Sequence, residues 1–543
     1  MAMTLHNRLY GDTRPALLIL LGAVGVLLLT ACANVCNLLL ARGARRQTEF
    51  ALRVALGASR GRLTRSLLTE SIVMSLGGGL LGLLVPLLAV GWFVRMAPST
   101  ISQVERIQVD ATVLGFTFAI AVAAGLLVGI VPALEAGRRN LSEALSRSIQ
   151  ATISPRQHRL GRILIVVELA TALVLLTCAG LLTRSFARVL AIDTGFRPEG
   201  VLVVAIDLPP TRYSDESAAR FLTALLERAR GLHGVESAAL ADAAPLDRMR
   251  ASLSIRQADG RQTPIMELIA VSPGYFATVG TPLLAGRDFS RDDRAGRPPV
   301  AIVNATLARL MYPGLQPTGQ RLPTPVARGG QATIIGVVKD ASRDALEAEA
   351  RPAVFVPVGQ TGVKTSELLM IRTAGDPINL QRPVQQLVRS MDTALPAPSF
   401  RTMEQVLSTA RAPRRFSFVL LTIFALLAAT LAAVGLYGVM AYLVADRTRE
   451  MGIRLALGAE PRRLVRLVVS HGMWLAVLGV IIGVGGSLAA VRLLRRMLFG
   501  VSIYDPWTFA AGSALLTAVA FAACWVPARR AARIDPIVAL RAD

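Results

Sequence analysis

The sequence predicts a polytopic α-helical membrane protein with about seven transmembrane helices and one extracytoplasmic α/β domain. Of its 543 residues, 53% are hydrophobic and 17% are charged, and the mean hydropathy is +0.51, which is too apolar for a water-soluble domain. Seven stretches are apolar for long enough to cross a bilayer, and one 17-residue segment occurs twice. These features together indicate a duplicated helical membrane protein.

The seven predicted spans follow from helix geometry. A helix rises about 1.5 Å per residue, so a hydrocarbon core of about 30 Å requires about 20 apolar residues. The stretches that meet this requirement are Ala16–Ala41, Leu67–Val94, Thr112–Leu134, Ile163–Thr183, Phe416–Ala445, Leu467–Val491 and Thr508–Ala528.

Arginine marks the loops expected on the cytoplasmic side. The chain has 59 Lys and Arg against 36 Asp and Glu, a net charge of +23, yet residues 193–411 hold 25 basic and 22 acidic residues. The remaining excess lies on short segments after the first, third, fifth and seventh spans, which is the positive-inside pattern and not that of a nucleic-acid groove. We therefore expect a multi-pass membrane protein, with the N-terminus outside, the C-terminus cytoplasmic and no nucleic-acid partner.

The first apolar stretch is expected to remain as a helix, because residues 1–14 lack the order of a cleavable signal peptide. The four cysteines all lie inside predicted spans, so we expect no disulfide framework in the outer domain. A pair four residues apart in the first span is interpreted as packing, not as a metal site. The four are Cys32, Cys36, Cys178 and Cys524.

An internal repeat is the most informative feature. EFALRVALGASRGRLTR from Glu49 returns as EMGIRLALGAEPRRLVR from Glu450, with nine of 17 positions identical. The match extends into the next span, where Gly78 and Gly82 correspond to Gly479 and Gly483 and form small-xxx-small pairs that favour close helix packing. VPALEAGRRNLSEAL from Val131 likewise matches VPARRAARIDPIVAL from Val526. The chain is therefore predicted to contain two parallel repeats of a three-helix unit.

The segment EMGIRLALGA at Glu450 resembles the hallmark of FtsX/MacB-type permeases of ABC transporters. The outer segments YFATVGTPLLAGRDFSRDD, VAIVNATLARLMYPG, IIGVVKD and FVPVGQ resemble the MacB-like periplasmic core domain. The whole chain is most similar to the duplicated orphan permeases, in which one chain carries two FtsX-like halves. Against that pattern the N-terminal half lacks its first helix and outer domain, so the chain resembles a truncated or split member.

The resemblance implies a location in the bacterial inner membrane, a domain order and a set of partners. The expected segments are a short extracytoplasmic tail (1–15), the first FtsX-like copy (16–137), a cytoplasmic basic linker (138–162), the fourth transmembrane helix (163–184), the MacB-like core domain (185–415) and the second FtsX-like copy (416–543). The expected partners are an ABC ATP-binding subunit, the lipid bilayer, and a second copy or the separately encoded missing half.

The repeated motif is expected to form a rigid elbow at the membrane surface. Gly458 and Ala459 favour a helix end, and Glu460 and Pro461 favour a new helix start. The family resemblance implies that this segment docks into the ATPase subunit, while binding of anionic lipid headgroups is the alternative. The candidate coupling residues are Glu49, Arg53, Gly57, Glu450, Gly452, Arg454 and Gly458.

No sequence of the form G-x-x-x-x-G-K-[ST] occurs, so we expect no ATP hydrolysis by the chain itself, no directly bound cofactor or metal, and energy from ATP through a partner ATPase. We expect the outer block to form small sheets backed by helices, with Asp292 and Asp293 in a solvated loop and no catalytic constellation. The strands are expected at Val201–Asp207, Pro299–Val303, Thr333–Val338, Ala353–Val358 and Leu368–Thr373, and the helices at Ala218–Arg230 and Leu380–Met391.

Glu168 is the intramembrane charge that stands out. An ionised carboxylate inside a span is costly, so Glu168 is expected to face a partner, a cavity or the interface, with Arg159 or Arg162 able to pair with it. Glu70 is interpreted as a packing or snorkelling residue. The function that fits best is an ABC-type permease subunit that transmits ATP-driven movement to its outer domain for efflux or extraction. The alternative is a non-transporting membrane scaffold or sensor that signals to an envelope partner.

Overall fold

A computed structural model describes residues 14–45, 60–96, 110–138, 155–246, 251–254, 265–324, 330–342, 350–361, 366–446, 460–495 and 498–531. The chain divides into two compact units. The first contains Met1–Arg188 together with Pro413–Asp543, and the second contains Val189–Ala412. The boundary falls inside two helices, α7 and α13, so each of these is a single helix with residues in both units.

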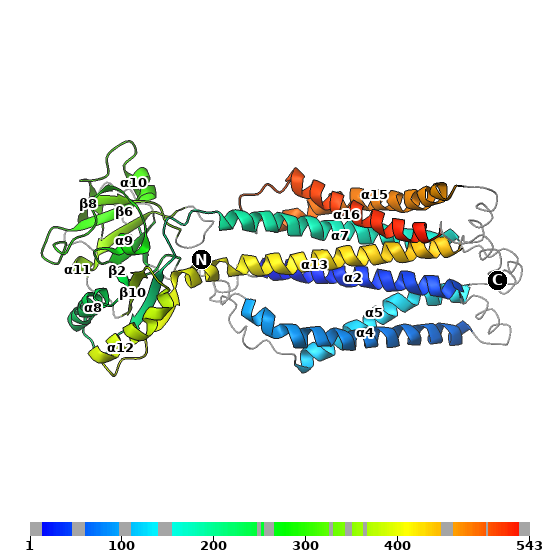
Figure 1. Cartoon of the computed structure of the whole chain (residues 1–543), viewed down its shortest axis with the longest axis horizontal. Coiled ribbons are helices and arrows are strands. Elements are labelled where there is room, and N and C mark those ends of the chain that lie inside the picture. The colour runs from blue at the N-terminus through cyan, green and yellow to red at the C-terminus, as the bar shows by residue number, and fades with distance from the viewer. Residues whose placement is uncertain are drawn as a thin grey trace, which may run out of the picture. The chain divides into compact units, whose positions relative to one another are not determined.

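The first unit is a bundle of long apolar helices (Figure 1). Its helices are apolar around most of their circumference, which is the pattern of helices that are surrounded by protein and lipid. They are α2 (Arg14–Arg45), α4 (Arg60–Met96), α5 (Ala111–Arg138), α7 (Pro155–Leu190), α13 (Met403–Asp446), α15 (Pro461–Leu494) and α16 (Pro506–Ala531).

Among the described residues, five helices are long and apolar enough to cross a membrane: Leu18–Cys36, Gly161–Leu190, Arg415–Ala441, Arg462–Leu494 and Pro506–Arg530. They coincide with the first, fourth, fifth, sixth and seventh predicted spans. At the second and third predicted spans, the described apolar helices are shorter, Leu68–Leu84 and Ala111–Leu126. The prediction of several apolar membrane helices is therefore confirmed, with five that reach the full length.

Helix α7 forms the core of the first unit. Ile165, Leu169 and Leu173 are at most 1% exposed, and they belong to a cluster that also contains side chains of α2, α13, α15 and α16. Of the five spans, α7 is the most buried, with 56% of its apolar window inside the protein against 17% for α16. The fourth predicted span is thus the central helix of this unit.

The second unit is a mixed α/β domain. It contains strands β1 (Val201–Asp207), β2 (Val235–Ala241), β3 (Ala251–Leu253), β4 (Met266–Val271), β5 (Leu283–Gly286), β6 (Val300–Asn304), β7 (Arg321–Pro323), β8 (Gln331–Val338), β9 (Ala353–Pro357), β10 (Ser366–Thr373) and β11 (Ser399–Thr402). Its helices are α8 (Asp215–Arg230), α9 (Tyr275–Val279), α10 (Ala305–Met311), α11 (Val358–Thr361), the 3₁₀ helix η2 (Pro377–Leu380) and α12 (Gln381–Met391).

All five strands and both helices predicted for this unit are present, with bounds that shift by at most three residues. The expectation of separate small sheets was wrong. Within the described residues the strands form one sheet in the order β11-β1-β10-β2-β4-β9-β6-β8-β5, with β3 beside β4 and β7 beside β8. A single pair, Ala241 with Val271, joins β2 to β4, so the sheet is narrow at that point.

The sequence motifs of the outer unit meet in space as structural contacts. Asn304 caps α10, and its Nδ2 donates to Asp340 Oδ1 at 2.8 Å, while Thr306 Oγ1 donates to Asp340 Oδ2 at 2.9 Å. The segments VAIVNAT and IIGVVKD are therefore held together by one carboxylate. Phe276 and Phe355, from two other motifs, form an edge-to-face pair with ring centroids 4.8 Å apart.

The expectation of a solvated loop at Asp292 and Asp293 was half wrong. Asp292 is exposed, but the side chain of Asp293 is only 8% exposed. Its carboxylate accepts from Arg287 Nη1 and Nη2 at 2.8 and 3.0 Å and from Ser290 N at 2.8 Å. The bidentate pair with Arg287 holds the pKa of Asp293 below its ordinary value. The loop therefore folds around Asp293.

Candidate functional site

The predicted coupling residues lie outside the described residues. They are Glu49, Arg53, Gly57, Glu450, Gly452, Arg454 and Gly458. Described helices flank both motifs in the sequence. Helix α2 ends at Arg45 and α4 begins at Arg60, while α13 ends at Asp446 and α15 begins at Pro461. The candidate site is therefore built from the helix ends that flank the two motifs.

The start of α15 matches the helix restart that the sequence predicted. Glu460 is the N-cap with an extended backbone, Pro461 follows at the first helical position, and Arg463 N donates to the Glu460 carbonyl at 3.0 Å. Proline suits this position because its missing N–H would have no partner there. The second motif is thus followed at once by a rigid helix.

Both copies begin this helix with exposed arginines at equivalent positions. Arg62 and Arg65 in α4 correspond to Arg463 and Arg466 in α15, and all four are exposed. Residues three apart on a helix lie on the same face, so each copy presents two guanidinium groups one turn apart. This basic pair is the described part of the site that the two copies share.

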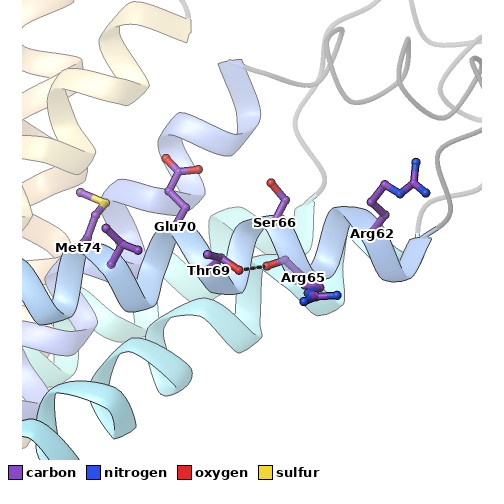
Figure 2. A pocket seen from close by; sticks show the side chains of 7 residues that line it. Arg62, Arg65, Ser66, Thr69, Glu70 and Met74 are labelled. Carbon is purple, nitrogen blue, oxygen red and sulfur yellow. Dashed lines mark hydrogen bonds between the residues drawn. The ribbon is translucent and has the colours of Figure 1, made fainter.

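In the first copy, the arginine pair borders an open depression along α4 (Figure 2). Its lining changes from basic to apolar along the helix, and Thr69 Oγ1 donates to the Arg65 carbonyl at 2.8 Å. Glu70, predicted to pack or snorkel, lies half-buried in the middle of this series. The lining residues are Arg62, Arg65, Ser66, Thr69, Glu70, Val73 and Met74.

In the second copy, the first turns of α15 are fastened to two other helices. Leu464 and Val468 pack with Val444 of α13 and Ala528 of α16 in a small buried cluster. On the same helices, Arg530 Nη1 donates to the hydroxyl of Tyr437 at 3.1 Å. The first turns of α15 therefore pack against both α13 and α16.

Farther along α15, Gly479 and Gly483 lie against α7. A Cβ built on Gly479 would lie 2.6 Å from Leu169 Cβ, and one on Gly483 would lie 2.9 Å from Leu173 Cβ. Both distances are shorter than real Cβ contacts allow, so the two backbones approach as closely as only glycine permits. The predicted small-residue pair thus brings α15 onto the central helix.

The corresponding pair in the first copy behaves differently. Gly78 and Gly82 are exposed, and no described atom lies within 4 Å of a Cβ built on either one. Helix α4 approaches α5 through another face, where Cβ atoms on Gly125 and Gly129 of α5 would lie 2.9 and 3.0 Å from Ile72 and Ser71. The expectation that Gly78 and Gly82 form a close helix contact is therefore wrong for the described residues.

Sequence reasoning missed a set of polar contacts, here called the polar anchor, near the C-terminal end of α7. Arg184 forms an ion pair with Asp505, and Phe499 N donates to Ser185 Oγ at 2.8 Å. Asp505 also accepts from Thr508 N at 3.0 Å, and the hydrogen bonds from Thr508 and Arg184 keep the pKa of Asp505 below its ordinary value. An aspartate directly before Pro506 is a helix-start signal that could have revealed this anchor.

The described residues hold no group of three or more His, Cys, Asp or Glu side chains arranged to bind a metal ion. Two basic helix starts can receive an acidic partner, and one of them is packed rigidly onto the core of the bundle.

Comparison with known proteins gives matches over most of the chain. The model described as FtsX-like permease C-terminal matches residues 21–141 and 422–536, and the model described as MacB-like periplasmic core domain matches residues 112–390. The macrolide export ATP-binding/permease protein MacB of Azoarcus sp. is 28% identical over 50% of this chain and 42% of its own length. The probable syringafactin export ATP-binding/permease protein SyfD of Pseudomonas syringae pv. tomato is 27% identical over 51% of this chain and 42% of its own.

The chain thus spans less than half the length of these curated relatives. Among solved structures, the periplasmic region of MacB from Actinobacillus actinomycetemcomitans is 12% identical, with a TM-score of 0.28, over 41% of this chain and 97% of its own.

Proposed function

This chain belongs to the family of FtsX-like and MacB-like ABC transporter permeases, and we propose that it transmits ATP-driven movement to its outer unit. In this proposal a separate ATPase docks at the two repeated motifs, and the outer unit expels or extracts a substrate on the far side of the membrane. The relatives above are named as a macrolide export protein and a probable syringafactin export protein, which supports export as the class of activity.

The observation that carries the proposal is the packing of α15. Its exposed arginine start stands next to the second motif, its first turns pack on α13 and α16, and its glycine face lies on α7. Because close-packed helices move as a unit and do not compress, displacement at the motif is passed to the centre of the bundle.

The route from the bundle to the outer unit is covalent and helical. The boundary between the units falls inside α7 and α13, and α13 continues without a break from Met403 to Asp446. Close to this boundary, α7 is tied to the segment between α15 and α16 through Arg184 and Asp505. The same two helices that receive the movement therefore lead into the outer unit.

The contacts within the outer unit favour a mechanical role for it over a catalytic one. The side chains that its motifs bring together cap helices, pair with arginine or stack as aromatics. These contacts hold a fold in shape. We therefore place the work of this unit in its movement and in surfaces that contact a substrate or an envelope partner.

The test is charge reversal at the described arginine pair of α15. Arg463→Glu with Arg466→Glu should reduce the amount of ATP-binding subunit that copurifies with the tagged full chain, because the docking surface changes sign. Arg382→Glu with Arg389→Glu is the matched control, since both arginines are exposed on α12 of the outer unit. Equal retention of the ATPase by both double variants would contradict docking at α15.

A transport assay then separates the proposal from the scaffold or sensor alternative. Vesicles with the chain and its ATPase should expel substrate only when ATP is hydrolysed. ATP hydrolysis that alters an envelope partner but moves no substrate would support the signalling role instead.

A further inference from the structure

A buried glutamate in the helix bundle has no role in the proposed function. Glu168 in α7 is 1% exposed, and neither carboxylate oxygen has a hydrogen-bond partner among the described residues. The expected pairing with Arg159 or Arg162 is not formed, because both arginines are exposed and lie on other faces of α7. A bare carboxylate in such a place would be costly.

The carboxyl group of Glu168 faces an amide from a distant part of the sequence. Asn34 of α2 is 5% exposed, and its Nδ2 donates to the Leu431 carbonyl of α13 at 2.9 Å. Its Oδ1 has no hydrogen-bond partner. Asn34 Oδ1 and Glu168 Oε2 both border the point that a Cβ on Gly435 would occupy. Helices α2, α7 and α13, which run side by side in Figure 1, thus meet at a carboxyl group and an amide oxygen that have no hydrogen-bond partner among the described residues.

The nearby hydroxyl groups do not supply the missing hydrogen. Thr30 Oγ1 donates to the Val26 carbonyl at 2.9 Å, and Thr171 Oγ1 donates to the backbone carbonyl of Glu168 at 3.0 Å. Each hydroxyl has one proton, and both protons are directed to the backbone. Glu168 Oε2 and Asn34 Oδ1 therefore receive no hydrogen bond from the described residues.

Among the described residues, no charged side chain pairs with Glu168. The arginines and acids of the helices packed around α7 lie toward the helix ends. Between those ends, the described titratable side chains are the thiols of Cys32 and Cys36 in α2, Tyr437 in α13, His471 in α15 and Cys524 in α16. Tyr437 accepts from Arg530, and His471 is exposed. Within the described residues, none of these groups forms a hydrogen bond or ion pair with the Glu168 carboxylate.

We propose that Glu168, Asn34 and Gly435 form a proton-binding site that joins α2 to α7 and α13. One proton on Glu168 removes the charge and lets the carboxyl O–H donate to Asn34 Oδ1, which gives Glu168 Oε2 and Asn34 Oδ1 a hydrogen bond to each other. Gly435 makes the contact possible, because any Cβ there would overlap both oxygens. Loss of the proton places a carboxylate against an amide oxygen and loosens the junction of the three helices.

A proton fits this site better than a metal cation. Hard cations take about six oxygen ligands, whereas three side-chain oxygens converge here and the amide N–H of Asn34 points to Leu431. Sodium binding is nevertheless a measurable outcome, and the experiment includes it.

The direct test is infrared spectroscopy of the purified full chain in lipid nanodiscs. At neutral pH the wild-type protein should show the carbonyl stretch of a protonated carboxylic acid, and Glu168→Gln should lose that band. Glu216→Gln, which removes an exposed carboxylate on α8, should keep it. Asn34→Leu should shift the band to the frequency of an acid without a hydrogen bond. Labelling the glutamates of the wild-type protein with a heavy carbon isotope assigns the band even if a variant fails to fold.

A second experiment measures the stability of the junction between α2, α7 and α13. Raising the pH into the alkaline range should lower the midpoint of thermal unfolding of the wild type more than that of Glu168→Gln, which stays neutral and can still donate to Asn34. Absence of the acid band at neutral pH in wild type would overturn the proposal. Loss of the band on adding sodium chloride at constant pH would also overturn it, in favour of a cation site.

Discussion

Asp293 shows how one carboxylate organises a loop of the outer unit. Its carboxylate accepts hydrogen bonds from both terminal nitrogens of Arg287 and from the backbone N–H of Ser290. Its neighbour Asp292 has the same charge but is exposed. Sequence reasoning could not separate the two, because what distinguishes them is the turn that brings Arg287 back onto only one of them.

Asp293→Asn should destabilise the loop by about 1–2 kcal/mol at neutral pH, since the amide cannot replace a bidentate carboxylate. Because the pKa of Asp293 is lowered in the folded protein, its contribution is fully present above the unfolded pKa of about 3.9. The contribution disappears as the pH falls through the lower, folded value. The difference between variant and wild type should therefore shrink below about pH 4.

Hydrogen–deuterium exchange over β5 and the following loop of the full chain measures this effect, with Asp292→Asn as the matched control. Equal exchange rates in the two variants at neutral pH would show that the Arg287 pair contributes nothing to the loop.

Glu168 marks the limit of sequence reasoning at the same scale. Burial could be predicted from its position inside an apolar span, but its neighbour could not. Arg159 and Arg162 are close in sequence, whereas Asn34 is 134 positions away and belongs to another helix. Only the packing of α2 onto α7 brings the two together.

At the scale of elements, Gly78 and Gly479 occupy equivalent positions of the repeat, so the same substitution can be compared at both. Gly479→Ala should destabilise the bundle by about 1–3 kcal/mol, because its Cβ would lie 2.6 Å from Leu169 Cβ and α7 would have to shift. Gly78→Ala meets no described atom and should be neutral or stabilising by up to about 1 kcal/mol. Thermal unfolding of both variants in the same detergent checks this, and a larger loss for Gly78→Ala would contradict the assigned packing.

The two coupling motifs are expected to be unequal. The second copy has Gly452 where the first has Ala51, and a glycine permits closer approach of a docking subunit. Arg454→Glu should therefore weaken ATPase association more than Arg53→Glu does. The measurement is the amount of ATPase retained in pull-downs from membranes with matched expression. Equal losses in the two variants would contradict the prediction that the motifs are unequal.

Elements with a strong local pattern could be predicted from the sequence, and others could not. The long apolar helices and β1 carry a continuous hydrophobic signal, and α8 has clear helical spacing. Strand β2, with the sequence VESAALA, is rich in alanine and carries little strand signal of its own. It forms because β10 provides an antiparallel partner along most of its length. The single sheet likewise depends on pairings between distant segments.

For the whole molecule, the arginine distribution predicts which side each segment faces. A reporter fused after Arg60 or Arg462 should report the cytoplasm, and one inserted near Arg328 should report the outside. Residue 328 lies outside the described residues, within the long segment between α7 and α13. Protection of the Arg328 site from protease added to the outer face of the membrane would reverse this topology.

The central proposal is that ATP hydrolysis by an ATPase docked at the coupling motifs moves the outer unit, and a distance measurement tests it most directly. Spin labels at Gln386→Cys on α12 and Tyr504→Cys beside α16 are both exposed and belong to different units. In the full chain bound to its ATPase, we expect the distribution of distances between the labels to change between the nucleotide-free and ATP-bound states. We expect no such change in the Arg454→Glu variant. Identical distributions in the two states, with ATP hydrolysis intact, would contradict the account.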